Sequence, residues 1–371
     1  MRRRLLLIAT VVAMVAAACG GGGGADDDLQ AAIDACTPGQ TDGDLNLYNW
    51  SEYIDPELIP KFEQEAGVTV VETFYDSNET ALAQLEAGGS PYDLIVPSDY
   101  MVTTMKDADL LMKLNRDAIP NLANIDPAFA SGLPFDPDAE YTAPYQWGTT
   151  GIGFNLDYVD PENGVSWGVI FDPDTSAGYA GKISLLNDER ETMGAALKYL
   201  GYSVNSESDE ELQQAADLIN ATKDRIATFD SDAYDDLLVT GETVVAHGWN
   251  GGFFAAFDNN DLWDQYGYAI PEEGGVVWVD NMAVPYTAEH PCTAQTFIDF
   301  MLDAENGADL TNFNFYASPN LAAEEFIDPE ILDDPAIYPP QEMLSDGSLE
   351  FIADVGDMAT KYADYFVEAK S

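Results

Sequence analysis

Apolar and polar residues alternate along the chain with two different periods, so strands and helices are predicted in turn. Leu45 and Leu47 alternate with polar neighbours, as in a half-buried strand. Apolar residues then recur at helical spacing, and Gly67 is placed to end that helix. The first predicted elements are a strand over residues 45–48, a helix over 56–65, a strand over 68–74, a helix capped by Asn78 and a strand over 92–96.

This order predicts a parallel sheet covered by helices, which is the α/β fold class. The length of 371 residues is enough for two domains. Ligands of open α/β sheets lie beyond the carboxyl ends of the strands, so unusual residues at these ends are candidates for a site. The later chain repeats the pattern, with strands over 183–186 and 244–246 and helices over 189–200 and 251–257.

Aromatic and acidic residues recur together at the predicted strand ends. Aromatic ring faces attract an organic ammonium ion, and carboxylates form charge-assisted hydrogen bonds with it. Their convergence predicts a site for a cationic amine. The segments are Trp50-Ser51-Glu52-Tyr53, Ser98-Asp99-Tyr100, Asp188 with Glu191, Trp249-Asn250 and the run 276–285, which contains Trp278 and Asp280.

Asp280 lies within an apolar, strand-like run, where an unpaired carboxylate is costly to bury. The whole chain has 14 Lys plus Arg to set against 67 Asp plus Glu, so few cations are available to pair with it. A charge without a partner in the sequence favours a cationic ligand.

These residues also have ordinary structural explanations. Asp188 and Glu191 have the spacing of a capping box at the start of a helix, and taken alone this role is favoured. Arg190 between them could neutralise one acid. The tryptophans could be core residues, and the tyrosines could be surface rings. Only the convergence of several such segments favours a binding site.

The formal net charge of −53 excludes some partners. A chain this acidic repels nucleic acid and anionic lipid and attracts cations. The charge fits a salt-adapted source organism, because molar salt shortens the screening length to about 3 Å. An acidic surface kept for solubility in moderate salt fits equally well.

The N-terminus has the pattern of a secretory signal over residues 1–18: three arginines, an apolar run too short to span a bilayer, and small residues before Cys19. The last residues resemble a lipobox, so Cys19 is expected to carry lipid, and a plain cleaved signal is the alternative. Residues 19–43 are expected to form a flexible, lipidated tether and linker. Both alternatives place the folded part outside the cytoplasm.

Two more cysteines follow. In an oxidising compartment, Cys36 and Cys292 are expected to form a disulfide. It would tie the segment before the first strand to a predicted helix over residues 293–303. Two buried free thiols are the alternative.

No catalytic residue, cofactor or metal site is predicted. His247 and His290 do not belong to a metal-ligand spacing. The chain lacks a P-loop, a full dinucleotide fingerprint and a Gly-x-Ser-x-Gly elbow. Paired carboxylates could run glycoside hydrolysis, but acid pairs are common in so acidic a chain.

An ordered set of motifs resembles the spermidine/putrescine-binding proteins of bacterial ABC importers from about Asp44 to the C-terminus. The resemblance implies a type II periplasmic-binding-protein fold, two α/β lobes around a central cleft. The motifs are "YNWSEYI", "DSNET", "YDLIVPSDY", "PYQWGTTGIGFN", "HGWNGG", "PEEGGVVWVDNMAVP" and "NLAAEE".

The resemblance also implies roles for single residues. Asp280 would hold an inner ammonium group, and Asp188 with Glu191 a terminal amine. Ser51 and Ser98 would be hydroxyl partners, and Glu52 a further acid. The matching aromatic box comprises Trp50, Tyr53, Tyr100, Trp249, Trp278 and Tyr316.

Some residues bear on the choice of ligand. Glu52 and Trp278 resemble the spermidine-preferring branch, whereas Ala317 after Tyr316 is closer to the putrescine branch. Asp99 stands where the family pattern has a neutral residue. A glutamine expected near the end of the chain is replaced by Ile352 or, with a gap, by Glu350.

By analogy, lobe 1 is expected over residues 44–145 plus 279–322 and lobe 2 over 146–278 plus 323–371. The expected function is that of a monomeric, non-enzymatic, lipid-anchored binding protein that delivers spermidine or putrescine to an ABC permease. A protein for another cationic amine, a sugar or ferric iron is one alternative class. An extracytoplasmic hydrolase that uses Asp188 and Glu191 is the other.

Overall fold

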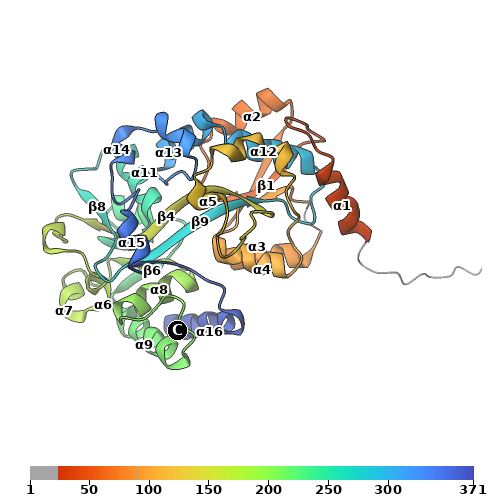
Figure 1. Ribbon diagram of the computed structural model, residues 1–371. Helices are drawn as coiled ribbons and strands as arrows, with labels where there is room; N and C mark the ends of the chain where they lie inside the picture. Colours follow the sequence, from red (N-terminus) through yellow and green to blue (C-terminus); the bar gives the residue numbers. More distant parts are fainter. Residues whose placement is uncertain (1–23, 90) are drawn as a thin grey trace, which may run out of the picture.

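The structure, a computed structural model, describes residues 24–89 and 91–371 (Figure 1). Ten strands form one mixed sheet in the order β2-β1-β3-β9-β4-β7-β5-β6, with β10 beside β9 and β8 beside β4. The strands are β1 Leu45–Trp50, β2 Val70–Tyr75, β3 Leu94–Ile95, β4 Thr142–Asn155, β5 Ile183–Leu185, β6 Ile226–Phe229, β7 Val245–Trp249, β8 Tyr266–Ala269, β9 Gly275–Ala283 and β10 Leu349–Phe351.

Helices cover the sheet, and none of those in the described ranges has both the length and the apolar character needed to cross a bilayer. They are α1 Gly24–Asp34, α2 Leu58–Ala66, α3 Asn78–Ala87, α4 Asp99–Asp107, α5 Pro127–Ala130, α6 Gly168–Phe171, α7 Pro173–Ser176, α8 Glu189–Tyr199, α9 Asp209–Thr222, α10 Tyr234–Val239, α11 Asn250–Asn260, α12 Pro291–Met301, α13 Ala304–Asn314, α14 Pro329–Leu332, α15 Gln341–Ser345 and α16 Ala359–Lys370.

The predicted first unit is confirmed: β1 is parallel to both β2 and β3, and α2 and α3 connect these strands. Gly67 ends α2 with a left-handed φ of 70°. The predicted cap of α3 was wrong by one residue, because the Oγ of Ser77 accepts the backbone N–H of Thr80. Asn78 is instead buried, and its Nδ2 donates to the Oγ of Ser98 (3.0 Å).

Two long antiparallel strands, β4 and β9, cross the middle of the molecule (Figure 1). They join the β2-β1-β3 group to the β7-β5-β6 group, and all residues of β9 are buried. Gly148 of β4 lets the two strands hold an aromatic side chain between them, because a Cβ there would come within 2.7 Å of the Trp278 ring. Of the two central strands, β9 carries the candidate site residues Trp278 and Asp280.

Several predicted boundaries differ from those observed. β7 begins at Val245 and continues to Trp249, and α11 follows directly at Asn250. The strand extends three residues beyond the predicted end at residue 246, so Trp249 is its last residue. The predicted helix over 293–303 begins two residues earlier at Pro291, a residue suited to the first helical position.

The expected flexible linker was wrong in part, because α1 lies within it. Ile33 is fully buried, and α1 packs against α12. The side chain of Gln30 also bonds both the backbone N–H and the C=O of Lys113. Glycine and aspartate suggested a hydrated tether, whereas the apolar residues that follow them anchor a helix. The signal over 1–18 and Cys19 lie outside the described residues.

Cys36 and Cys292 form a disulfide in the structure, with the two Cα atoms 5.3 Å apart. Alkylation of the unreduced protein is expected to leave both unmodified, and peptide mapping should recover their peptides joined. Reduction should lower the stability of the fold by about 2–5 kcal/mol, since the bond closes a very long loop. Two alkylated cysteines at these positions in the native protein would contradict the pairing.

Candidate functional site

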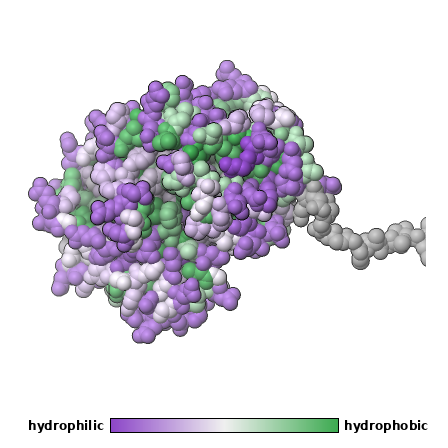
Figure 2. All heavy atoms as spheres, viewed as in Figure 1, coloured by the Kyte–Doolittle hydropathy of each residue, from purple (hydrophilic) through white to green (hydrophobic). Residues whose placement is uncertain are grey.

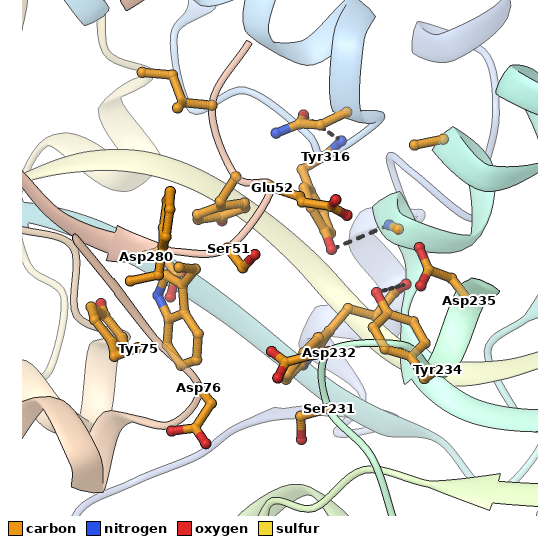
Figure 3. Close-up of a pocket in the computed structure, with 18 of the residues that line it drawn as sticks. Ser51, Glu52, Tyr75, Asp76, Ser231, Asp232, Tyr234, Asp235, Asp280 and Tyr316 are labelled. Carbon is orange, nitrogen blue, oxygen red and sulfur yellow. Dashed lines mark hydrogen bonds between the residues drawn. The ribbon is translucent and has the colours of Figure 1, made fainter. Parts of the chain in front are cut away.

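All twelve side chains predicted for ligand binding line one cavity of about 740 Å³ (Figure 3). They come from both strand groups, from the central strand β9 and from the segment after α13, so residues far apart in the sequence meet there. They are Trp50, Ser51, Glu52, Tyr53, Ser98, Tyr100, Asp188, Glu191, Trp249, Trp278, Asp280 and Tyr316.

Most of these residues lie at or just beyond the carboxyl end of a strand, where ligands of open α/β sheets are expected. Trp50 is the last residue of β1, and Trp249 is the last residue of β7. Ser98 follows β3 at the N-cap position of α4, while Asp188 follows β5 and caps α8 through its side chain. The turn after Trp50 holds Glu52 in a left-handed conformation with φ 55°, which is uncommon for a residue with a side chain.

Asp188 has the structural role that its spacing suggests, and it also faces the cavity. Its Oδ1 accepts the backbone N–H groups of Arg190 (2.9 Å) and Glu191 (3.0 Å). The reciprocal half of a capping box is missing, because the carboxylate of Glu191 points elsewhere. Asp188 lines the cavity and is only 6% exposed.

Glu191 lies in the cavity wall between two strands. Its Oε1 accepts hydrogen bonds from Thr150 Oγ1 (3.0 Å) and Trp249 Nε1 (3.2 Å). Its Oε2 is buried and has no hydrogen-bond partner among the described residues. Burial, followed by the charge of Asp188, raises the pKa of Glu191 to about 8.

Asp280 is buried in the middle of β9, as its sequence context implied. Burial raises its pKa to about 7, and the nearby hydroxyls of Ser98 and Tyr53 lower it in part. Its Oδ1 is buried without a hydrogen-bond partner in the part of the chain that the structure describes. An ionised Asp280 would therefore be stabilised by a donor from outside the chain.

The aromatic residues form two walls. One joins Tyr53, Trp278 and Tyr316, with ring centroids 5.2–6.5 Å apart. The other pairs Trp50 with Trp249 at 6.2 Å. The rings are held in place by hydrogen bonds from their polar atoms: Trp50 Nε1 donates to Val96 O at 2.9 Å, and Tyr316 Oη accepts the N–H of Gly252 at 3.2 Å.

The cavity contains further acids that the sequence did not single out for ligand binding. Burial raises the pKa of Asp235, one of these acids, to about 7, and the charges of Asp236 and Glu52 also raise it. Figure 3 shows Asp235 beside Tyr234 and Tyr316 at one side of the cavity. These additional carboxylates are Glu72, Asp76, Asp99, Asp232, Asp235 and Asp236.

The two candidates for the position of the expected glutamine lie in different surroundings. Ile352 follows β10 and lines the cavity. Glu350 lies elsewhere, in an ion pair with Lys198 (2.5 Å) and a hydrogen bond from Ser203. Of the two candidates, the one that lines the cavity is thus the apolar Ile352.

The charge of the cavity is of one sign. Ten carboxylate side chains line it, and its lining includes no lysine or arginine. None of these ten takes part in an ion pair within residues 24–89 and 91–371. Figure 2 shows that hydrophilic residues also cover most of the face in view.

Comparison with known proteins places this geometry in a family. The model of the bacterial extracellular solute-binding proteins matches residues 57–339. The chain belongs to this family. The members of this family are binding proteins without enzymatic activity. Membership accounts for the α/β fold around a central cavity.

Three similar proteins illustrate the family. The spermidine/putrescine-binding periplasmic protein of Escherichia coli is 34% identical over 328 residues, 88% of this chain and 91% of that protein. A candidate spermidine/putrescine ABC transporter structure from Listeria monocytogenes has a TM-score of 0.81 at 36% identity, covering 89% of this chain and 99% of that one. A lipoprotein of Treponema pallidum has a TM-score of 0.76 at 34% identity, covering 88% and 99%.

Proposed function

We propose that this solute-binding protein captures a polyamine, spermidine or putrescine, for an ABC importer. The observation that carries the proposal is the cavity itself, lined by ten carboxylates and by aromatic rings and without a basic side chain. An extended polycation fits this arrangement, because its ammonium groups need anionic acceptors and its methylene segments need apolar walls. The related binding proteins named above support the ligand class.

In the proposed complex, Asp188 and Glu191 hold a terminal ammonium group. The vacant Oε2 of Glu191 is a suitable acceptor. Asp280 holds an inner ammonium group through its unpartnered Oδ1. The two aromatic walls cover the methylene segments, with Ser51, Ser98 and Glu52 as further polar contacts.

The proposed lobes are residues 44–145 plus 279–322 and residues 146–278 plus 323–371. Supporting this division, α16 packs against α8 and α9 near the C-terminus, and β10 pairs with β9. The ligand contacts divide between the lobes as well, with Trp50 and Tyr100 on one side and Glu191 and Trp249 on the other. Closure of the lobes around the ligand would exclude water and present a surface to the permease.

We propose that Cys19 carries the lipid anchor and that the protein acts as a monomer at the membrane surface. The lipobox-like sequence before Cys19 supports an anchor, as does the similarity to a lipoprotein of Treponema pallidum. The helix α1 follows the anchor and joins the folded part through its contact with α12. The extracytoplasmic location itself follows from the family.

The alternative ligands fit the cavity less well. A sugar would use the aromatic walls but leave the buried carboxylates without cations. Ferric iron needs hard oxygen ligands, and the tryptophan rings of Trp50, Trp249 and Trp278 in the cavity lining offer a metal no oxygen. A glycoside panel tests the hydrolase alternative, and turnover that Glu191→Gln abolishes would revive it.

Isothermal titration of the purified protein with spermidine and then putrescine in high salt tests the proposal. One-to-one saturable binding of micromolar strength, about −8 kcal/mol, is expected. The tighter ligand identifies the preferred polyamine. Heat that does not saturate and that fades as salt rises would instead indicate counterion attraction to an acidic surface.

A further inference from the structure

Asp99 places a carboxyl group in the cavity to which the polyamine site described above gives no role. It is the first residue of α4, lines the cavity and is 2% exposed. An aspartate in the first turn of a helix ordinarily stabilises the helix dipole at the surface. This one is buried, and it departs from the neutral residue of the family pattern.

The backbone holds Asp99 next to Asp280. Asp99 Oδ1 accepts the N–H of Tyr100 (2.7 Å), and Oδ2 accepts the N–H of Val279 (3.2 Å). Val279 directly precedes Asp280 on β9, and Ser98 forms a β-bridge with Asp280. The start of α4 and the middle of β9 therefore present two carboxyl groups at the same part of the wall.

No basic side chain neutralises this pair. Arg190 attracts Asp99 electrostatically, but its guanidinium group donates to Ala353 O and Asn205 Oδ1, each at 3.1 Å. Among the described residues, no ion pair includes Asp99 or Asp280. Asp280 is 5% exposed, and its unpartnered Oδ1 independently indicates a missing donor.

We propose that Asp99 acts with Asp280 as a specificity-determining pair that selects amines with an internal secondary ammonium group over diamines of the same length. The inference rests on the proposed polyamine function. A secondary ammonium has two N–H donors, so it can bond both carboxylates at once, one on α4 and one on β9. A diamine of the same length presents only methylene groups at this point of the chain and leaves the pair without a donor.

A matched pair of ligands isolates this contact. Spermidine and 1,8-diaminooctane both place eight chain atoms between their terminal nitrogens, and they differ only in the internal ammonium group. In the purified protein, Asp99→Asn is expected to weaken spermidine binding about tenfold or more, as for a lost charged hydrogen bond, and 1,8-diaminooctane binding less than about threefold. Asparagine keeps an oxygen acceptor for one of the two backbone N–H groups.

The control is Asp136→Asn, which neutralises a remote buried carboxylate that accepts backbone N–H groups of Glu140, Tyr141 and Thr142. It should lower the melting temperature and leave the ratio of the two affinities unchanged. If Asp99→Asn fails to fold, Asp99→Ser permits the same comparison.

Equal losses for both ligands, or no loss for either, would overturn the role of Asp99 while leaving the polyamine function standing. A wild-type protein that binds neither spermidine nor putrescine would overturn the proposed function, and this inference with it.

Discussion

Asp280→Asn is expected to weaken spermidine binding by at least about 1.5–3 kcal/mol, roughly 10- to 150-fold. The variant removes the charge that an inner ammonium group would meet and keeps the size of the side chain. The free protein should fold as well as wild type at pH 8, because burial disfavours the ionised carboxyl that asparagine replaces. Titration calorimetry measures the affinity, and thermal unfolding of the free protein checks the fold.

The remote Asp136→Asn variant separates this effect from a general loss of negative charge. It should bind spermidine as tightly as wild type does. If Asp280→Asn bound spermidine with unchanged affinity, Asp280 would have a structural role only, and the inner ammonium group would need a different acceptor.

Spermidine affinity is expected to rise at least about tenfold between pH 6 and pH 8. Burial raises the pKa values of Asp280 and Glu191 to about 7 and about 8, so both carboxyls of the free protein are largely protonated at pH 6. A cation binds their ionised forms, and binding must then release protons. The terminal amines stay protonated in this range, since alkylammonium pKa values lie near 10. The affinity should level off only about one pH unit above 8, where Glu191 is also ionised.

Calorimetry in buffers of different ionisation enthalpy measures the released protons directly. Near pH 7, release is expected for wild type, and less for Asp280→Asn, which lacks one of the groups. An affinity that stays constant from pH 6 to 8 would mean that the cavity carboxylates are already ionised in the free protein.

The twelve candidate residues chosen from the sequence line one cavity, whereas several of the predicted element boundaries differ from those observed. Residues such as Trp50 and Trp249 could be found because the sequence shows roughly where a strand gives way to a helix, even when the exact first and last residues of the strand are not predicted. The family resemblance then supplied roles for these residues, which the pattern alone left open between core and ligand contact. Which of Ile352 and Glu350 lines the cavity depends on the pairing of β10 with β9, which no local pattern specifies.

Three features were not predicted because their local sequence is inconspicuous: two cavity acids after β6, the burial of Asp99, and the helix α1. β6 is short and only half buried, so the sequence does not predict it as a strand. Asp232 and Asp235, which follow it in the chain, therefore did not stand out as residues at a strand end. Asp99 resembles an ordinary first-turn acid of a helix, and only the tertiary contact with Val279 shows that it is buried. The helix α1 was missed because its stability comes from packing against α12 rather than from its own glycines and aspartates.

The disulfide also makes a covalent ring of the chain from Cys36 to Cys292. Eleven of the twelve predicted ligand contacts, all except Tyr316, lie on this ring. A protease that cuts one exposed loop inside it opens the ring without releasing a fragment, because the two new ends remain joined through the sulfur atoms. For a protein exposed to extracellular proteases, a nicked copy thus stays in one piece, with both sides of its cavity attached.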